Sequence, residues 1–262
     1  MPNDTQASPG YTGPLLNKVP EVTVCFWLIK VLSTTVGETA ADFLSTNLNL
    51  GERTTGLIMS GLLIVALSFQ FRAPQYVAGT YWTTVVLISI VGTLITDNLS
   101  DNCNVPLEAT ATIFALALML TFAAWHASER TLSIHTIFTR RRQGFYWLAV
   151  LFTFALGTAA GDLISEKLNL GYWVALGLFA AAIAVACVAR FGLKANAVAS
   201  FWAAYILTRP LGASLGDLIS QPKGAGGLGI GTTITSAVFL AAILALVGYL
   251  TVSKTDVPAK PA

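Results

Sequence analysis

A four-residue pattern that recurs four times constrains this chain more than any other feature of its sequence. The pattern is a tryptophan, a glycine ten positions later, an aspartate five positions after the glycine and a serine three positions after the aspartate. Identical spacing in four places indicates tandem duplication of one structural unit. The copies are Trp27, Gly37, Asp42 and Ser45; Trp82, Gly92, Asp97 and Ser100; Trp147, Gly157, Asp162 and Ser165; and Trp202, Gly212, Asp217 and Ser220.

The intervals between the copies indicate two successive duplications. Copies one and two begin 55 positions apart, as do copies three and four, and the second pair follows the first at an offset of 120 positions. The word Leu-Asn-Leu-Gly occurs at 48–51 and again at 168–171, which is the same offset. The first two copies therefore form a half that recurs as the last two.

Composition indicates that each copy is a pair of membrane-spanning helices. Hydrophobic residues make up 55% of the chain and charged residues only 11%, against about 25% charged in an ordinary soluble domain. Several apolar runs reach the roughly 20 residues that a helix needs to cross a bilayer. The predicted fold class is an all-α polytopic membrane protein with eight transmembrane helices in four tandem two-helix repeats, at approximately 23–46, 54–71, 78–99, 107–125, 145–165, 172–191, 197–220 and 230–252.

An even number of spans per copy makes all four copies cross the membrane in the same direction. We therefore expect a pseudo-fourfold or two-by-two parallel repeat about the membrane normal. The two tails and the 2–3, 4–5 and 6–7 loops hold ten basic residues, whereas the opposite side holds only Arg53, Lys167 and Lys223. Because cytoplasmic loops are enriched in Lys and Arg, both termini are predicted to be cytoplasmic.

Five segments follow from this topology. They are a polar N-terminal tail at 1–21, a first membrane half at 22–126, a basic cytoplasmic connector at 127–144, a second membrane half at 145–252 and a C-terminal tail at 253–262. The first 20 residues are polar and rich in proline, without the pattern of a secretory signal, so we expect them to be disordered. The connector contains Arg140-Arg141-Arg142, which we interpret first as a topology anchor and second as a contact for anionic lipids.

Within a motif-bearing helix, the tryptophan and the serine share one face and the aspartate lies about 60° from them. The tryptophan and the aspartate should be about 22 Å apart, so the first marks the cytoplasmic interface and the second the outer third of the membrane. We interpret the tryptophans as interfacial anchors. The glycines are predicted to be packing positions, because a small residue follows each of them four positions later, namely Ala41, Thr96, Gly161 and Gly216.

The aspartates allow two interpretations. They lie near the outward helix ends, where solvated carboxylates with local hydrogen bonds would be ordinary. Ionisable groups inside a membrane, however, usually face the bundle interior or a wet cavity, and the fourfold recurrence favours a shared site. Oxygen ligands alone favour Mg, Ca or Mn over Zn or Cu. The predicted site is a ring of negative charge that protons or a cation would relieve, formed by Asp42, Asp97, Asp162 and Asp217 with Ser45, Ser100, Ser165 and Ser220 in support.

Three further charges fall inside the predicted spans. Lys30, Glu38 and Arg209 lie on the face of their helices that carries the aspartates. An isolated charge near the midplane costs at least about 2.5–3.5 kcal/mol, so we expect Glu38 to pair with Lys30 or Arg209. Such a pair can be a neutralising bridge, part of a substrate or proton pathway, or both. Pro210, directly after Arg209, also predicts a kink.

Signals of enzymatic chemistry are weak. The stretch 212–216 matches the G-x-S-x-G pattern of serine hydrolases, but the only histidines, His126 and His135, fall at or beyond the end of a span. Cys25, Cys103 and Cys187 show no pairing pattern. We therefore expect neither an enzymatic activity nor a cofactor, and no nucleic acid as a partner.

The repeats and two short stretches resemble a known family. Phe26-Trp27, Lys-Val-Leu-Ser-Thr-Thr-Val-Gly-Glu at 30–38 and Leu-Thr-Arg-Pro-Leu-Gly-Ala-Ser at 207–214 are similar to the most recognisable stretches of a bacterial family with four tandem two-span repeats. Its members are generally described as uncharacterised repeat-containing or membrane-anchored proteins. The resemblance covers residues 22–252. It implies the architecture and a bacterial inner (plasma) membrane, without catalytic residues to carry over.

The leading functional hypothesis is a secondary transporter or exporter of a small divalent cation, Mn among several candidates, with or without proton coupling. Glu38 and the aspartates would bind the ion or shuttle protons, while Arg209 and Lys30 would hold the charge of Glu38 and exchange partners during the cycle. One alternative is a scaffold or sensor whose polar cluster only holds the helices together. Another is a carrier of a small anion or organic solute clamped by Arg209 and Lys30. Membrane lipids are the other expected partners.

Overall fold

Residues 17–258 are described in the computed structural model, and in this range the chain forms eight α-helices and no strand. Seven of the helices are long and apolar enough to cross a membrane, which confirms the prediction of an all-α chain with membrane-length helices. The remaining helix, α7, is 24 residues long but is not among these seven, and it carries Arg209, Pro210 and Asp217. The helices are α1 Val24–Asp42, α2 Glu52–Arg72, α3 Ala78–Asp97, α4 Leu107–Glu129, α5 Arg140–Asp162, α6 Gly171–Phe191, α7 Ala197–Ser220 and α8 Thr232–Ser253.

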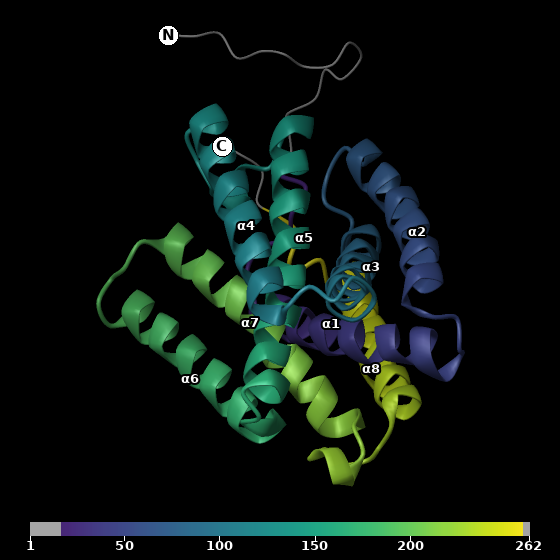
Figure 1. Cartoon of the computed structure of the whole chain (residues 1–262). Coiled ribbons are helices and arrows are strands. Elements are labelled where there is room, and N and C mark those ends of the chain that lie inside the picture. The colour runs from purple at the N-terminus through teal and green to yellow at the C-terminus, as the bar shows by residue number, and fades with distance from the viewer. Residues whose placement is uncertain (1–16, 259–262) are drawn as a thin grey trace, which may run out of the picture.

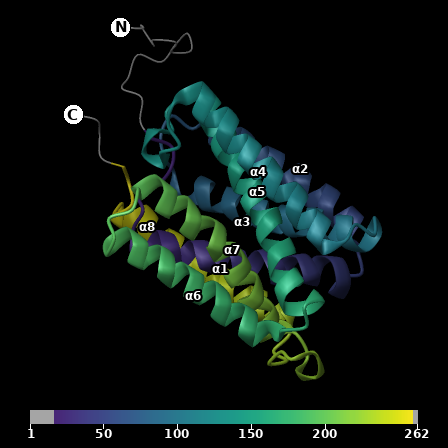
Figure 2. The same cartoon turned by 60° about the vertical axis from the view of Figure 1, so that its left-hand side comes forward.

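The helices form an inner ring and an outer layer (Figure 1, Figure 2). The ring consists of α1, α3, α5 and α7, which carry the four motifs and contact one another in cyclic order, with α7 closing against α1. Outside it, α2 packs on α3, α4 on α5, α6 on α7 and α8 on α1. Each outer helix therefore packs mainly on the motif helix of the following copy, so one repeat needs its neighbour to bury its apolar surface.

The four motif glycines make the close approaches within the ring, as their small size predicts. A Cβ atom added to any of them would overlap an atom of the next ring helix. The residue that it would meet always stands three positions before the glycine of its own motif, so the four interfaces share one register. The pairs are Gly37 with Ser89, Gly92 with Phe154, Gly157 with Arg209 and Gly212 with Thr34.

A π-helical turn follows the motif aspartate in three of the four copies. These turns are Phe43–Asn47, Asn98–Asn102 and Leu163–Lys167, at the ends of α1, α3 and α5. In the fourth copy α7 continues as an α-helix through Pro210 to Ser220. The recurring Leu-Asn-Leu-Gly words come directly after two of the π-helical turns, and their Asn and Gly residues take the positive φ angles that redirect the chain into the next helix.

The outer helices expose apolar side chains, as lipid-facing helices do. Examples are Leu57, Ile64, Val185, Val188 and Leu244.

The segments at the ends of the spans differ from the expectation in two places. Residues 17–20 are buried rather than disordered, while residues 1–16 lie outside the described part of the chain. The connector is shorter than predicted, because α4 extends to Glu129 and α5 begins at Arg140.

Candidate functional site

Four positions of each motif helix stack as layers along the axis of the ring. They stand 3, 7, 11 and 15 residues after the motif tryptophan, so successive layers are about one helical turn apart. Every member of the first three layers is buried. The lysine layer contains Lys30, Val85, Val150 and Tyr205; the arginine layer Thr34, Ser89, Phe154 and Arg209; the glutamate layer Glu38, Thr93, Thr158 and Ala213; and the aspartate layer the four motif aspartates.

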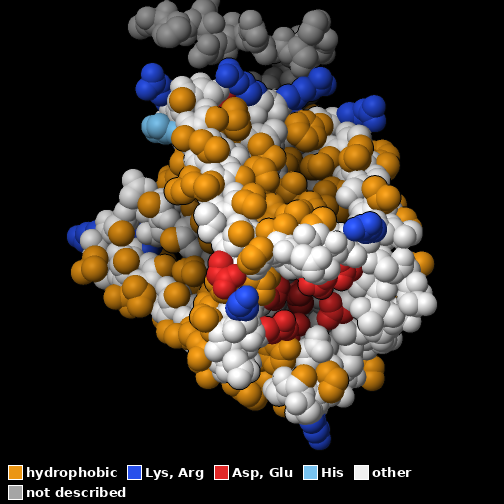
Figure 3. All heavy atoms as spheres, in the orientation of Figure 1, with side chains coloured by type: hydrophobic (Ala, Val, Ile, Leu, Met, Phe, Trp, Pro, Cys, Tyr) orange, Lys and Arg blue, Asp and Glu red, His pale blue; other side chains and the backbone are white. Residues whose placement is uncertain are grey.

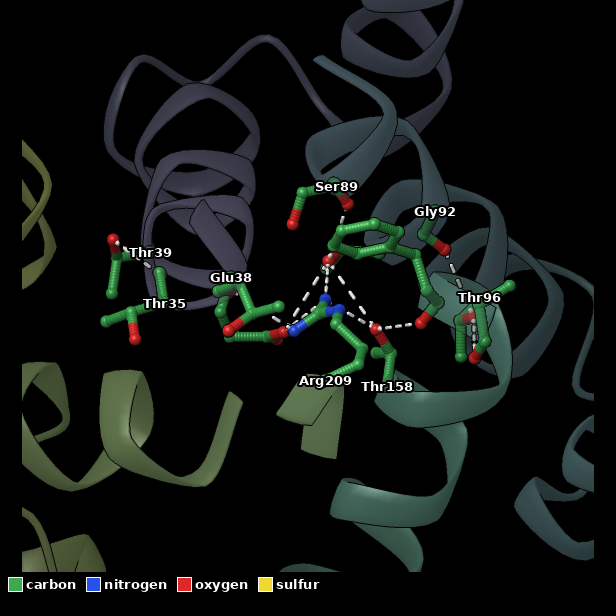
Figure 4. A network of polar contacts seen from close by, with 12 residues as sticks. Thr35, Glu38, Thr39, Ser89, Gly92, Thr96, Thr158 and Arg209 are labelled. Carbon is green, nitrogen blue, oxygen red and sulfur yellow. Dashed lines mark hydrogen bonds and ion pairs between the residues drawn. The ribbon is translucent and has the colours of Figure 1, made fainter. Parts of the chain in front are cut away.

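Arg209 joins all four ring helices at the glutamate layer (Figure 4). Its Nη2 donates to Oε2 of Glu38 at 2.9 Å, to Oγ1 of Thr158 at 2.7 Å and also to Oγ1 of Thr93. Its Nη1 donates to the backbone carbonyl of Thr34 at 3.3 Å. The guanidinium therefore contacts α1, α3 and α5 from α7.

Differences between the copies make room for this network. The three acceptors in the glutamate layer have only Ala213 as their counterpart on α7, so the guanidinium from the arginine layer, one turn earlier, fills the vacant place. The ion pair is secluded, with 0% of the Arg209 side chain and 8% of the Glu38 side chain exposed. Additional hydrogen bonds are what allow such a pair to offset its desolvation. Of the two partners that the sequence left open for Glu38, the structure selects Arg209.

Lys30 is not part of this network. Its Nζ atom is fully buried and has no hydrogen-bond partner among the described residues. It lies 3.9 Å from the ring centroid of Phe154 and 4.3 Å from that of Tyr205. Ring faces attract a cation, but they do not accept a hydrogen bond as a carboxylate does.

The motif aspartates line a hollow at the C-terminal ends of the ring helices. In Figure 3 its acidic side chains gather in the lower half of the face, and Lys and Arg side chains cluster at the upper end. The cavity has a volume of about 480 Å³, and Glu38 lies in its lining, so the Arg209 network forms its floor. The carboxylates in the lining are Glu38, Asp42, Glu52, Asp97, Asp101, Asp162, Glu166 and Asp217.

The closest set of carboxylates at the floor is not the predicted ring of four aspartates. Oxygens of Glu38, Asp162 and Asp217 lie within 4.8 Å of one another, which is the closeness needed to share one cation. Asp42 instead accepts a hydrogen bond from Nε2 of Gln221 at 3.3 Å. All four aspartates line the same hollow, but the copies differ in how closely they approach the floor.

The motif serines divide into two pairs. Ser45 and Ser100 line the hollow, as a supporting role predicts. Ser165 donates to the backbone carbonyl of Gly161 at 2.9 Å, and the buried Ser220 is outside the lining. Two of the four serines are therefore in place to contact something in the hollow.

The motif tryptophans pack inside the opposite end of the ring. Trp82, Trp147 and Trp202 are buried, and Trp27 is partly buried. Together with the aromatic residues before them they form a cluster of stacked and edge-on rings. Packing within the protein, rather than lipid contact alone, is therefore the role of these side chains.

A segment of the chain covers this aromatic end. We call residues 17–22 the N-terminal strap. Asn17 donates from Nδ2 to the carbonyl of Ile134 at 3.1 Å and accepts at Oδ1 from the amide of Ile137 at 3.2 Å. Lys18 accepts from Nε2 of Gln70 at 3.2 Å through its carbonyl. These bonds join the strap to α2 and to the 4–5 connector, and the acidic hollow has no lining residue in this region.

Sequence reasoning missed two groups of residues in this site. Thr93 and Thr158 each donate to a backbone carbonyl of their own helix, and each also contacts Arg209. Aligning the copies at 11 positions after the tryptophan would have placed both beside Glu38. The carboxylates Glu52, Asp101 and Glu166 lie outside the motif. Asp101 and Glu166 each stand four positions after a motif aspartate, so this shared spacing could have placed both at the hollow, whereas Glu52 has no such signal.

Comparison with known proteins addresses the repeat itself. Four segments, 25–76, 80–131, 145–195 and 200–256, match the family described as Repeat of Unknown Function (DUF347). The chain belongs to this repeat family. The matched segments coincide with the four two-helix copies and confirm the family resemblance seen in the sequence. No curated protein and no solved structure matches the chain.

Proposed function

We propose that this protein is a secondary transporter of a small divalent cation and that the acidic hollow is the entry to its binding site. The observation that carries the proposal is the sharing of Glu38 between two partners. One of its oxygens pairs with Arg209, and it also belongs to the cluster of three carboxylates with Asp162 and Asp217.

The chemistry of the hollow favours a hard cation. The lining holds eight carboxylates and one basic residue, Lys167, which pairs with Glu108 at 3.7 Å. Carboxylate, hydroxyl and amide oxygens are the ligands that Ca²⁺, Mn²⁺ and Mg²⁺ prefer. The same charge disfavours an anion, so the carrier of anions considered from the sequence is the weaker alternative.

Competition for Glu38 supplies a physical link between binding and conformational change. A ligand shifts an equilibrium only by binding one state better than another. A cation that draws the charge of Glu38 weakens the pair with Arg209, which links α1 to α7 across the floor of the hollow. Binding therefore favours states in which these two helices separate.

The arrangement of the ends supports transport between two compartments. α7 is enclosed by α1, α5 and α6, so we propose that it spans the membrane as the eighth helix despite its charges. The basic loops then place both termini in the cytoplasm of a bacterial cell, with the copies arranged about the membrane normal and the hollow open to the outside. Because no ATP-binding motif occurs in the sequence, transport would use an ion gradient.

Calorimetry on the purified full-length protein in detergent tests the binding step. Titration with MnCl₂, MgCl₂ and CaCl₂ should show saturable binding of at least one ion. Asp162→Asn and Asp217→Asn should weaken it by at least about tenfold, since each removes one charged ligand. Glu21→Gln is the matched control, because Glu21 is a partly exposed carboxylate of the strap that faces His135 and does not line the hollow.

The outcomes separate transport from a structural role. Binding that is lost in folded Asn variants, and flux of the same ion into proteoliposomes, would support the proposal. No binding of any ion to the folded wild type, with Asn variants that change only the melting temperature, would overturn it in favour of a scaffold or sensor.

A further inference from the structure

Lys30 is the one charged side chain of the ring interior that the arrangement above leaves without a role. It sits in the lysine layer, two layers below the glutamate layer, and 0% of its surface is exposed. Among residues 17–258 its Nζ has no hydrogen-bond acceptor, and the hydroxyl of the neighbouring Tyr205 is likewise buried without a partner there. The aromatic ring faces are the only groups that stabilise a charged ammonium at this site. Because no acceptor requires the charge, the site can also hold Lys30 as a neutral amine.

Few charges face Lys30 from the helices around it. From α7 come Tyr205 and, one turn further, Arg209. α8 contains no charged residue, α3 contains only Asp97 at its end, and α5 has none between residues 143 and 161. No carboxylate is therefore available to Lys30 at its own level in the described ring.

Arg209 connects Lys30 electrostatically with the floor of the hollow. The ring of Phe154 lies 3.9 Å from Nζ of Lys30 and 5.7 Å from Cζ of Arg209, measured to the ring centroid, so the two cations share one aromatic neighbour. In this structure the negative charge of Glu38 offsets the positive charge of Arg209. If a divalent cation takes over Glu38, the charge of Arg209 acts on Lys30 without that offset.

We propose that Lys30 carries the proton that is exchanged for the cation, an inference that rests on the proposed transport function. When the cation binds at Glu38, Asp162 and Asp217, α1 and α7 separate and water reaches Lys30. One N–H bond of the Lys30 ammonium then breaks, the electron pair stays on Nζ, and the proton leaves to this water. When the cation departs, Glu38 again pairs with Arg209 and the amine takes up a proton. Charge is thus exchanged between two sites that share no ligand.

Proton counting during cation binding tests this. MnCl₂ is added to the full-length protein in a weakly buffered detergent solution with a pH indicator, and protons released per Mn²⁺ bound are measured for wild type, Lys30→Met and Lys30→Arg. The carboxylates of the hollow also release protons, so the contribution of Lys30 is the decrease from wild type that Lys30→Met and Lys30→Arg share although they change the charge in different ways. Both variants should release about one proton fewer per ion than wild type at the pH of its largest release.

The two variants should differ in affinity. Lys30→Met removes a positive charge and should bind Mn²⁺ more tightly and with a flatter pH dependence, whereas Lys30→Arg keeps a charge that cannot be released and should bind more weakly. Because the substitutions change size and charge in different ways, a failure of one to fold leaves the other to decide.

Either failure is recognisable. Wild-type and variant proteins that bind Mn²⁺ with equal proton release would overturn the role of Lys30 and leave the cation site intact. A folded wild type that binds none of Mn²⁺, Mg²⁺ and Ca²⁺ would overturn the proposed function, and this inference with it.

Discussion

The two ends of the inner ring are built from the same four helices and yet differ in almost every physical respect. At the C-terminal ends, eight carboxylates line a cavity of about 480 Å³, and four of them, Glu38, Asp42, Glu52 and Glu166, accept hydrogen bonds from other side chains. At the N-terminal ends, rings of Phe, Tyr and Trp fill the space, and the hydroxyls of Tyr81 and Tyr146 lie 2.5 Å apart. The N-terminal strap adds buried hydrogen bonds over them.

This difference indicates that the side chains at each end of the ring decide whether that end is filled or hollow. The helices contact one another with one register at all four glycines, near the middle of the ring, whereas only one end is filled beyond that level. The proposed transport function requires one end of the ring to be open and the other closed, with Arg209 between them.

The largest effect is expected where the two ends meet. Arg209→Met would leave the charge of Glu38 buried without its partner, and breaking a buried pair costs about 3–5 kcal/mol. Denaturation in detergent should show this loss in the free energy of unfolding. The double variant Glu38→Gln/Arg209→Met should recover part of it, since no unpaired charge remains. Equal free energies of unfolding for wild type and Arg209→Met would show that the pair of Arg209 and Glu38 does not stabilise the ring.

A smaller effect is expected from filling the close contacts of the ring. Gly37→Ala and Gly212→Ala place a methyl group into Ser89 and Thr34, and overpacking of this kind costs about 1–3 kcal/mol. Gly61→Ala and Gly177→Ala are the controls on the outer helices, because nothing lies within 4 Å of the added atom. Melting temperatures should fall for the first pair and stay level or rise for the second. Similar changes in both pairs would contradict the packing role of the motif glycines.

The two ends should respond differently to loss of a hydrogen bond. Asn17→Ala at the aromatic end leaves buried partners unsatisfied and should cost about 1–3 kcal/mol. Ser45→Ala at the acidic end removes a 3.5 Å bond to the carbonyl of Asp42 that water can replace, and should change stability by less than about 0.5 kcal/mol. Chemical denaturation curves of the two variants test this. A larger loss of unfolding free energy in Ser45→Ala than in Asn17→Ala would contradict the contrast between the two ends.

The smallest effect is expected in the pH dependence of the aromatic end. Burial raises the pKa of Asp256, which accepts a hydrogen bond from Tyr76, so the folded state binds its proton more readily than the unfolded state does. Its stabilising contribution is present at low pH and is lost as the pH rises through the folded pKa. Asp256→Asn, which cannot ionise, should therefore gain slightly on wild type in melting temperature between about pH 4 and pH 8. A constant difference over that range would contradict this.

Periodicity predicted much of this protein because it is local. The spacing of the motif placed Lys30, Glu38 and Arg209 on the face of the aspartates, and the structure has all of them in the ring interior. It predicted close packing at the glycines, and a Cβ atom added to any of the four motif glycines would overlap the next ring helix. It did not reveal the π-helical turns, nor that residues 17–20 are buried. The burial of residues 17–20 depends on contacts with Gln70, Ile134 and Ile137, which are remote in the sequence.

By itself the sequence determined that four equivalent helices would turn equivalent faces toward one another, because the repeat and the helical period specify the direction of every side chain on its own helix. Only the tertiary structure decided which copy supplies the arginine and which the acceptors. Glu38 and Arg209 are 171 positions apart, and they meet because α7 closes the ring against α1. The residues that differ between copies occupy one shared space, so their sizes and charges can be satisfied only together, and that left Lys30 without a partner.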